Sequence, residues 1–474
     1  MQDYPRDMRG YGRTPPDPKW PGDARIAVQF VVNYEEGGEN CILHGDAASE
    51  AFLSEIVGAA PWPGMRHMNM ESIYEYGARA GFWRLHRLFT RENVPVTVFG
   101  VATALQRSPE QVAAMREAGW EIASHGLKWI DYRDFDRKDE VDHMREACKI
   151  HEAVTGERPR GWYTGRSSAH TLDLAAENDD LLYTADSYAD ELPYWRDAGK
   201  RTHLVVPYTL DANDMRFATA QGFNAGEQFF AYLKDSLDVL YAEGGHGTPK
   251  MLSVGLHCRL AGRPGRFAAL ERFVGYIKQK PGVWLATRED IARHWHRTRP
   301  PRPLKPSRLG RASFVEIFGD IFEHSPWIAE AAHRGGLTAR EDSAGGLHAA
   351  MAKALDAADA AAKRALIDAH PDLAGKLAVA GGLTADSSAE QASAGLDRLS
   401  PALFQRFTAA NEAYRARFGF PFIMAVKGRS AAEILENFER RLNNGPEEEF
   451  ATALSEISRI ALLRLEARFS ETDS

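Results

Sequence analysis

The stretch RIAVQFVVNYEE, residues 25–36, joins a run of β-branched and aromatic residues to two adjacent glutamates. Such a run is typical of a β-strand. Seven more runs of this kind follow, separated by amphipathic helical patterns; they span residues 94–102, 121–125, 161–164, 181–188, 203–209, 251–257 and 283–287. The alternation predicts parallel strands covered by helices. Two architectures fit, a (β/α) barrel and an open doubly wound sheet, and we favour the barrel.

A chain of 474 residues exceeds what one hydrophobic core usually organises, which predicts two domains. Residues 297–310 read RTRPPRPLKPSRLG, and consecutive prolines hold the backbone extended. Beyond this stretch Ala, Leu, Glu and Arg dominate, with helical patterns at residues 347–369, 389–396, 401–418, 431–443 and 446–469. We therefore expect an α/β barrel over residues 1–300, a linker over 301–312 and an all-α domain over 313–474.

The composition argues against several kinds of partner. The net charge of −8 and the isoelectric point near 6.1 give no indication of a basic stripe, so nucleic acid is not expected. Cys41, Cys148 and Cys258 are far apart and in no CxxC spacing, which fits a reducing cytoplasm. No apolar run reaches the length that crosses a bilayer, and the N-terminus lacks the apolar region of a secretory signal. We expect small-molecule substrates, a cytoplasmic location and no membrane partner.

Polar side chains gather where the predicted strands end. In chain order they are Glu35, Glu36, His125, Arg166, Asp186, Asp211, Asn213 and His257. Because the carboxyl ends of barrel strands meet on one face, we expect these side chains to converge on one pocket. For Asp186, Asp211 and Asn213 a role as a helix cap or loop residue fits the sequence equally well.

Three motifs in this region, NYEEGGE (33–39), ASHGLKW (123–129) and GLHCR (255–259), resemble those of the polysaccharide-deacetylase superfamily. Members of that superfamily form distorted (β/α) barrels. The resemblance implies that Glu35 is the general base and that His257 is the general acid. It places Glu36 and His125 at the positions of a carboxylate and an imidazole metal ligand.

Trp129 replaces the second imidazole ligand of that superfamily. An indole cannot coordinate a metal, and an open catalytic zinc site needs about three protein ligands. The altered set, with GWYTGR, DSYADELPYW, PYTLDANDMRF and GLHCRLAGRPGR, resembles the allantoinases that branch from the superfamily and are thought to work without metal. The resemblance implies hydrolytic opening of the hydantoin ring of allantoin to allantoate. Such a reaction needs a base for water, donors for the oxyanion and an acid for the leaving nitrogen.

Two arginines and two tryptophans are candidates for binding the ring. Arg166 and Arg259 present planar forks suited to ureido and imide oxygens. Trp129 and Trp162 could stack on the flat ring, and core packing is the alternative for both. We interpret Cys258 as a small buried spacer rather than a nucleophile.

The last helical pattern carries an arginine on its apolar stripe. Arg464 falls on the same helix face as Ala453, Ile457, Ile460 and Ala467. An arginine in this position must meet an acid, a ligand or water. A substrate that bears a carboxylate would satisfy it.

His370 and Glu390 each have a structural explanation, as a partner of a helix C-terminus and as part of a capping box that begins at Ser387. Together with HPDLAGK (370–376), SAEQ (388–391) and FGFPFI (418–423), however, they resemble the 2-oxo-4-hydroxy-4-carboxy-5-ureidoimidazoline (OHCU) decarboxylases, an all-α family without cofactors. The resemblance implies that His370 is the acid or base, that Glu390 orients it and that Arg464 anchors a substrate oxygen. It also implies a pocket shaped by Pro371, Ser387 and Gln391, with backbone groups near Phe422 and Ile423 holding the ureido arm.

The two resemblances describe consecutive reactions. We expect a bifunctional enzyme of urate breakdown that decarboxylates OHCU to S-allantoin in its C-terminal domain and opens allantoin to allantoate in its N-terminal domain. The resemblance implies no metal, no organic cofactor and a homo-oligomer. The alternative is a zinc-dependent deacetylase of N-acetylated sugars, with Glu36 and His125 as ligands and a non-catalytic helical interaction domain.

Overall fold

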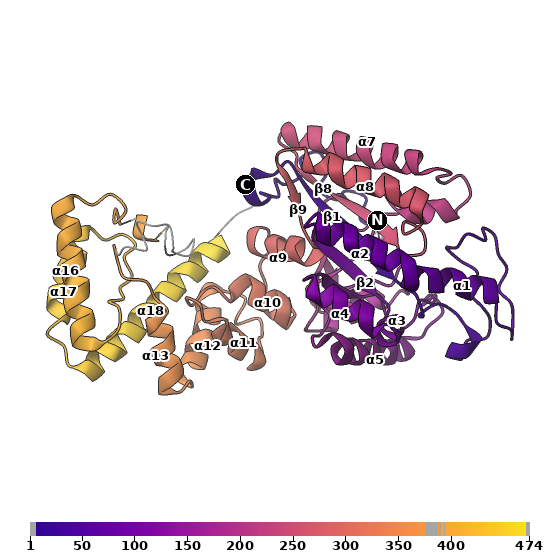
Figure 1. The fold of residues 1–474 in the computed structure, drawn as a ribbon. Helices are drawn as coiled ribbons and strands as arrows, with labels where there is room; N and C mark the ends of the chain where they lie inside the picture. Colours follow the sequence, from indigo (N-terminus) through magenta and orange to yellow (C-terminus); the bar gives the residue numbers. More distant parts are fainter. Residues whose placement is uncertain (1–5, 375–386, 388–389, 393, 471–474) are drawn as a thin grey trace. The chain divides into compact units, whose positions relative to one another are not determined.

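The computed structural model describes residues 6–374, 387, 390–392 and 394–470. The chain forms two compact units, unit 1 (Met1–Pro301) and unit 2 (Arg302–Ser474). Unit 1 combines a sheet with covering helices, and unit 2 is helical (Figure 1).

Unit 1 is built around a nine-stranded sheet. Its strands are β1 (Ile26–Tyr34), β2 (Val96–Gly100), β3 (Glu121–Ser124), β4 (Gly161–Trp162), β5 (Tyr183–Thr184), β6 (Tyr194–Ala198), β7 (Arg201–Val205), β8 (Lys250–His257) and β9 (Val283–Leu285). Their order is β6-β7-β5-β4-β3-β2-β1-β8, and β9 also pairs with β1. All pairs are parallel except β6 with β7. All eight predicted strands are present, and β6 is an additional one.

Strand β1 pairs with β2, β8 and β9, and all its residues are buried. Successive side chains of a strand point to opposite faces. On one face Phe30 contacts the rings of Phe89 and Phe273, with centroid distances of 5.2 and 6.3 Å. On the other face lie the polar side chains of Gln29 and Asn33, which are also buried. One face of β1 is therefore apolar, and the other carries buried polar side chains.

Side chains close the sheet into a distorted barrel between β7 and β8. The backbone link there is an isolated parallel bridge between Asn213 and Gly255. Arg288 lies at the start of α9 and donates hydrogen bonds to Gln29 of β1 at 2.6 Å and to Ser253 of β8 at 3.2 Å. The same guanidinium donates to the carbonyl groups of residues 206 and 207, which follow β7. The predicted distorted barrel is thus confirmed, with an arginine in place of continuous strand pairing at the seam.

The helices of unit 1 connect the strands and cover the sheet. They are α1 (Met68–Tyr76), α2 (Phe82–Arg91), α3 (Ala102–Arg107), α4 (Pro109–Glu117), α5 (Arg137–Thr155), α6 (Thr171–Glu177), α7 (Gly226–Gly245), α8 (Pro264–Lys278) and α9 (Arg288–Thr298). Shorter turns are η1 (Pro21–Asp23), η2 (Ile42–His44), η3 (Gly77–Gly81) and η4 (Asp214–Ala218). Helices α7 and α8 pack side by side near β1 and β8 (Figure 1).

Unit 2 is all-α over its described residues. Its helices are α10 (Arg311–Phe318), α11 (Pro326–Arg334), α12 (Ala344–Asp356), α13 (Ala360–Asp368), α16 (Pro401–Phe418), α17 (Ala431–Arg441) and α18 (Pro446–Ser470), with a short turn η5 (Pro306–Arg308). The predicted helix over 347–369 is two helices, because Asp359 caps α13 by accepting a hydrogen bond from the backbone of Ala362. The predicted helix over 389–396 lies partly outside the described residues.

The proline-rich stretch that follows unit 1 packs within unit 2. Leu304 and Leu309 are buried. The backbone N–H and the hydroxyl of Ser307 both donate to the carboxylate of Asp342 at 2.9 Å. These residues therefore contribute to the core of unit 2 as well as connecting the units.

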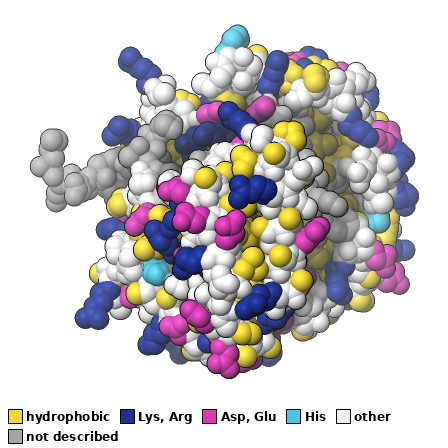
Figure 2. Space-filling view, turned by 90° about the vertical axis from the view of Figure 1, so that its left-hand side faces the viewer, with side chains coloured by type: hydrophobic (Ala, Val, Ile, Leu, Met, Phe, Trp, Pro, Cys, Tyr) yellow, Lys and Arg dark blue, Asp and Glu magenta, His cyan; other side chains and the backbone are white. Residues whose placement is uncertain are grey.

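One face of unit 2 mixes both signs of charge. Figure 2 shows the side on which α16 and α17 lie, where acidic and basic side chains are interspersed among apolar ones. In the part of the chain that the structure describes, no helix is both long and apolar enough to cross a membrane.

Candidate active sites

Glu35 lies at the centre of a buried polar cluster at the carboxyl end of β1. Its Oε1 atom is 3.4 Å from Nε2 of His125 and 3.5 Å from Nε2 of His257. Its Oε2 atom accepts a hydrogen bond from Nη2 of Arg259 at 2.7 Å. All four side chains are buried. The structure thus brings residues that follow β1, β3 and β8 onto one carboxylate, as expected for the carboxyl ends of barrel strands.

The adjacent residues Glu35 and Glu36 have opposite pKa shifts. Burial raises the pKa of both. For Glu35, Arg259 and His257 outweigh burial and hold the pKa well below 4.5. For Glu36 burial prevails and, with the nearby charge of Glu35, raises the pKa, although Arg259, whose Nη1 is 3.6 Å from Oε1, lowers it. Carboxyl groups whose surroundings separate their pKa values can hold different protonation states, as an acid and a base require.

Asp214 holds His257 in place, although the sequence pattern did not indicate it. Its Oδ1 atom accepts a hydrogen bond from Nδ1 of His257 at 2.6 Å. Its Oδ2 atom accepts from the backbone N–H groups of His257 and Ala261 at 2.7 and 2.8 Å. Burial lowers the pKa of His257, but Glu35 and Asp214 outweigh burial and raise it to about 9. The imidazole is therefore protonated at neutral pH, as a general acid requires.

Helix η3 brings the backbone close to Glu36. It is a π-helical turn between α1 and α2, and such turns are often found at functional sites. A Cβ atom at Gly77 would overlap the carboxyl group of Glu36 and lie 2.7 Å from both Cγ and Cδ. A Cβ atom at Gly81 would overlap the backbone carbonyl of Cys258. The two glycines therefore allow this turn to pack directly against the acidic pair and the segment after β8.

Trp129 lies beside the cluster, and two guanidinium groups face its ring. The Cζ atom of Arg166 is 4.3 Å from the ring centroid, and that of Arg259 is 5.2 Å away. Phe52 stacks on the same indole with a centroid distance of 6.0 Å and an interplanar angle of 21°. Trp129 is 4% exposed, as is His257. Its ring contacts hold Arg166 and Arg259 beside the cluster, and stacking of the indole on a substrate stays a prediction.

Four polar atoms of the predicted site residues are buried and have no hydrogen-bond partner. They are Oε1 of Glu36, Nδ1 of His125, Nη2 of Arg166 and Nη1 of Arg259. Buried polar groups are nearly always satisfied in native proteins, so each exception needs an explanation. Donors and acceptors in one cluster suit a small ligand that carries both carbonyl and N–H groups.

The three residues with an alternative structural role take that role. Asp186 accepts hydrogen bonds from the backbone N–H groups of residues 164 and 165 at 2.9 and 2.7 Å. Asn213 caps η4 through its side chain. Asp211 accepts from the hydroxyl groups of Thr209 and Tyr232, both at 2.9 Å. These side chains shape the loops around the site.

Trp162 and Cys258 are core residues. Trp162 packs in a buried cluster with Met144, Leu174 and Leu181. Cys258 is fully buried in the main core of unit 1. Core packing is therefore the alternative that holds for Trp162, and Cys258 is the buried spacer that the sequence predicted.

The donor set of unit 1 does not fit the zinc site that the superfamily implies. Glu36 and His125 provide two ligand positions, but the third belongs to Trp129, whose indole cannot coordinate. The guanidinium of Arg259 lies between the two glutamates and supplies positive charge there. Among the described residues, no group of three or more His, Cys, Asp or Glu side chains is arranged to hold a metal ion.

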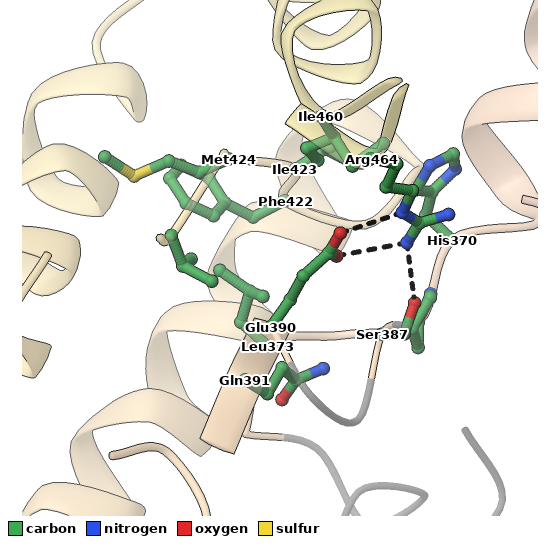
Figure 3. Close-up of a pocket in the computed structure, with 12 residues that line it drawn as sticks. His370, Leu373, Ser387, Glu390, Gln391, Phe422, Ile423, Met424, Ile460 and Arg464 are labelled. Atoms are coloured by element: carbon green, nitrogen blue, oxygen red, sulfur yellow. Dashed lines mark hydrogen bonds and ion pairs between the residues drawn. The ribbon is translucent and has the colours of Figure 1, made fainter. Parts of the chain in front are cut away.

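A pocket in unit 2 collects the predicted residues of the C-terminal domain (Figure 3). It has an empty volume of about 370 Å³, which includes its open mouth. All seven predicted residues line it: His370, Pro371, Ser387, Glu390, Gln391, Ile423 and Arg464. Apolar side chains complete the wall: Leu373, Phe422, Met424, Val426 and Ile460. Residues 375, 376, 388 and 389 of the predicted motifs lie outside the described residues.

Arg464 on α18 meets two acids. Its Nε and Nη2 atoms donate to the two oxygens of Glu390 at 2.8 and 3.0 Å. Its Nη1 atom donates to Oε2 of Glu323 at 3.0 Å, and Nη2 also donates to the hydroxyl of Ser387 at 3.2 Å. The sequence predicted an acid, a ligand or water for this arginine, and the acid is found. Glu323 itself was not indicated, because it lies in an irregular turn far from the other motifs.

His370 is held by the backbone rather than by an acid. Its Nδ1 atom donates to the carbonyl of Leu366 at 2.8 Å, which leaves Nε2 as the nitrogen with the lone pair. Burial lowers the pKa of His370 to about 4, so the imidazole is neutral at neutral pH. Because both oxygens of Glu390 accept from Arg464, the orientation of His370 by Glu390 stays a prediction.

A second buried arginine fixes the wall of the pocket near Ile423. Arg441 donates from Nη1 to the carbonyl of Ile423 at 2.7 Å, and its Cζ atom lies 4.4 Å from the ring centroid of Phe422. Glu449 accepts from Nε of the same guanidinium at 2.8 Å. The Ile423 carbonyl is thus already engaged, while its segment is held rigidly against the pocket.

Family comparisons agree with this division into two sites. A model of the polysaccharide deacetylase family matches residues 70–184, and a model of the OHCU decarboxylase family matches residues 307–466. A Schizosaccharomyces pombe (strain 972 / ATCC 24843) protein named "Putative polysaccharide deacetylase" is 42% identical over 317 residues, which are 62% of this chain and 98% of that protein. The 2-oxo-4-hydroxy-4-carboxy-5-ureidoimidazoline decarboxylase of Haloferax volcanii is 44% identical over 164 residues, 35% of this chain and 94% of that protein. The chain belongs to both families.

A solved structure refines the placement of the deacetylase-family unit. The Puue allantoinase is 58% identical, with a TM-score of 0.62, and the match covers 63% of this chain and 99% of that chain. All seven predicted residues that line the pocket of unit 2 lie within the range matched by the OHCU decarboxylase model. Both resemblances drawn from the sequence motifs are therefore confirmed at the level of family and fold.

Proposed function

We propose that the chain is a bifunctional enzyme of urate breakdown. In this proposal residues 313–474 decarboxylate OHCU to S-allantoin, residues 1–300 hydrolyse allantoin to allantoate, and residues 301–312 link the two. The 58% identity to the Puue allantoinase supports the hydrolase, and membership of the OHCU decarboxylase family supports the lyase. Because the product of one reaction is the substrate of the other, the two activities form a sequence.

In the hydrolase, Glu35 and His257 act as base and acid. The observation that carries this assignment is their pairing across 3.5 Å with opposite pKa shifts. Glu35 is ionised and can accept the proton of a water molecule that attacks a ring carbonyl. His257 is protonated and can deliver a proton to the leaving ring nitrogen. Asp214 keeps the imidazolium in the orientation that presents Nε2 to the site.

The remaining groups of the hydrolase bind the ring and its developing charge. Arg259 and Arg166 each have a buried guanidinium nitrogen that makes no hydrogen bond within the protein. Such preorganised donors stabilise an oxyanion far better in a buried site than in water. Glu36 and His125 provide further unpartnered atoms for the ring N–H and carbonyl groups. Trp129 positions the arginines through its ring contacts.

In the decarboxylase, His370 exchanges protons with the substrate and Arg464 binds its oxygens. The neutral imidazole presents Nε2, which can accept a proton from the substrate hydroxyl. Loss of carbon dioxide leaves an electron pair that the heterocycle absorbs, and protonation from one side then sets the configuration of allantoin. Pro371, Ser387 and Gln391 shape the pocket around this centre.

Reciprocal variants of the full chain test the two assignments. His370→Asn should slow enantioselective formation of S-allantoin from OHCU, generated in situ from urate, by about 100-fold or more, because general acid–base groups contribute on that scale. Glu35→Gln should slow allantoin hydrolysis on the same scale. Each variant should leave the other reaction unchanged, so each serves as the folding control for the other. Unchanged decarboxylation in His370→Asn would remove its assigned role.

We also propose that the enzyme is a cytoplasmic homo-oligomer. Cys41, Cys148 and Cys258 are buried free thiols, as a reducing compartment would preserve them. Six exposed large apolar side chains fall within residues 43–68: Leu43, Phe52, Val57, Trp62, Met65 and Met68. Exposed apolar surface of this kind supports a protein contact. Light scattering of the purified chain should give a mass above 52.7 kDa, and a strictly monomeric mass would refute the oligomer.

A further inference from the structure

The pocket of unit 2 holds one guanidinium between two carboxylates. Arg464 donates to Glu390 from Nε and Nη2 and to Glu323 from Nη1. Ser387 links the two sides, because its hydroxyl donates to Oε2 of Glu323 at 3.0 Å and accepts from Nη2 of Arg464 at 3.2 Å. The backbone carbonyl groups of residues 320 and 321 lie 3.4 Å from Nη1, so all five N–H groups of the guanidinium have acceptors before any substrate binds. A substrate oxygen can bind Arg464 only if one of these acceptors moves away.

The two carboxylates differ in their access to solvent. The side chain of Glu323 is 2% exposed, whereas that of Glu390 is 26% exposed and lines the pocket. Figure 3 shows the carboxylate of Glu390 pointing across the pocket to Arg464. Glu390 can exchange Arg464 for water or substrate at small cost. Removing Arg464 from Glu323 would leave a buried charge without its cation, which costs far more.

We infer that Glu323 is a positioning residue of this site: it anchors the Nη1 edge of Arg464 while Glu390 releases the opposite edge to the oxygens of the substrate. The inference rests on the proposed decarboxylase function of unit 2. It assigns different tasks to the two acids that pair with Arg464. Glu323 acts through Arg464 and does not need to touch the substrate.

Glu323 also acts on the charge state of His370. Burial is the main cause that lowers the pKa of His370, and Arg464 and His324 lower it further, whereas the negative charge of Glu323 raises it. Loss of that charge should therefore lower the pKa of His370. The acid limb of the decarboxylation rate, where the imidazole becomes protonated, should move to lower pH.

The test compares Glu323→Gln with Asp320→Asn in the full chain. Asp320 lies on the same turn, but its side chain is 54% exposed and pairs with Arg468 at 3.2 Å, so it is a matched control for loss of one carboxylate. Glutamine keeps the shape and an acceptor oxygen. For Glu323→Gln we expect kcat for OHCU, generated in situ from urate, to fall about 10- to 100-fold, because a small displacement of a binding group has effects on that scale. We expect KM to stay within about twofold, since Glu390 can still release Arg464, and the acid limb to move to lower pH.

The positioning role of Glu323 can be refuted in several ways. A Glu323→Gln variant that behaves like Asp320→Asn would overturn it, as would a rise in KM with an unmoved acid limb. If Glu323→Gln does not fold, Glu323→Asp carries the test, because it keeps the charge at a shorter reach. It should lower kcat without moving the acid limb, and a wild-type kcat would overturn the inference. A wild-type chain that does not accelerate decarboxylation would instead defeat the proposed function itself.

Discussion

Glu35 and Glu36 are neighbours of the same residue type, yet their surroundings shift their pKa values in opposite directions. Arg259 approaches Glu35 at 2.7 Å and Glu36 at 3.6 Å, and this difference accompanies a lowered pKa for the first and a raised pKa for the second. His257 completes the arrangement as a cation at neutral pH. The chemistry of the site is thus set by one arginine and one histidine around two carboxyl groups.

The Asp214→Asn variant tests the assignment of His257 as the acid. The raised pKa of His257, about 9, keeps the acid protonated up to that pH. Asparagine removes a charge that raises this pKa, so the basic limb of the pH–rate profile for allantoin hydrolysis should move to lower pH. We expect kcat to fall about 10²- to 10⁴-fold, the usual contribution of an oriented acid. The measurement is a pH–rate profile for allantoin hydrolysis.

Asp211→Asn is the matched control for that experiment. Asp211 lies in the same loop but accepts from Thr209 and Tyr232, away from His257. It should leave the basic limb in place. If Asp214→Asn also leaves the limb unmoved, His257 is not the acid that titrates there.

At the scale of single residues, the sequence predicts the candidate catalytic residues better than the residues that hold them in place. Glu35, His125 and His257 could be predicted because each lies at or directly after the end of a strand, and parallel strands end at one edge. Asp214 and Glu323 could not, because each reaches its partner from a loop whose path depends on tertiary packing. The DANDM stretch (211–215) contains two aspartates and an asparagine. The local sequence does not indicate which of the three accepts the hydrogen bond from the imidazole of His257.

At the scale of elements, the π-helical turn η3 decides how closely the α1–α2 segment approaches the acidic pair. Gly77 has a helical φ of −55°, so alanine is excluded by space and not by backbone conformation. Gly77→Ala should destabilise the fold by about 1–3 kcal/mol, as overpacking does. It should also lower allantoin hydrolysis about 100-fold, because Glu36 must shift. Denaturant unfolding and kcat measure the two effects.

Gly275→Ala provides the control for that substitution. Gly275 lies within α8, and a Cβ atom there would meet nothing within 4 Å. Alanine is more favourable than glycine at an exposed position inside a helix, so this variant should be about 0.5–1 kcal/mol more stable than the wild type. A Gly77→Ala protein with wild-type stability and rate would show that the close approach has no role.

Helices and strands with a clear hydrophobic pattern could be predicted from the sequence. Elements that depend on tertiary packing or on a side-chain cap could not. All eight expected strands are present, because each is a β-branched or aromatic run that the sheet buries fully or in part. Strand β6 escaped the pattern because it is an edge strand with two exposed charged residues, Arg196 and Asp197. The expected helix over 347–369 divides at Asp359, where a side-chain cap starts a new helix in place of continued periodicity.

At the scale of the whole molecule, each site is built from residues of one unit. The cluster around Glu35 draws on β1, β3 and β8 of unit 1, and the pocket around Arg464 draws on residues 323–464 of unit 2. Each unit also has its own buried core. The composition shift after residue 310 allowed this division to be predicted from the sequence.

Separate expression of residues 1–301 and 302–474 tests that independence. Because each unit carries a complete site, each fragment should fold and retain at least half of the kcat of its reaction in the full chain. The fragments are assayed with allantoin and with OHCU generated in situ, beside an equimolar mixture as a control. A more than tenfold loss in either fragment that the mixture restores would show that the sites depend on each other.

In the proposed hydrolase, an arginine-bridged acidic pair takes the place of a coordinated cation. The direct measurement is allantoate formation by protein treated with a chelator and verified by elemental analysis to contain less than about one metal ion per ten chains. We predict an unchanged rate, and added zinc should not increase it. Loss of hydrolysis on chelation, with recovery on return of zinc, would contradict the account.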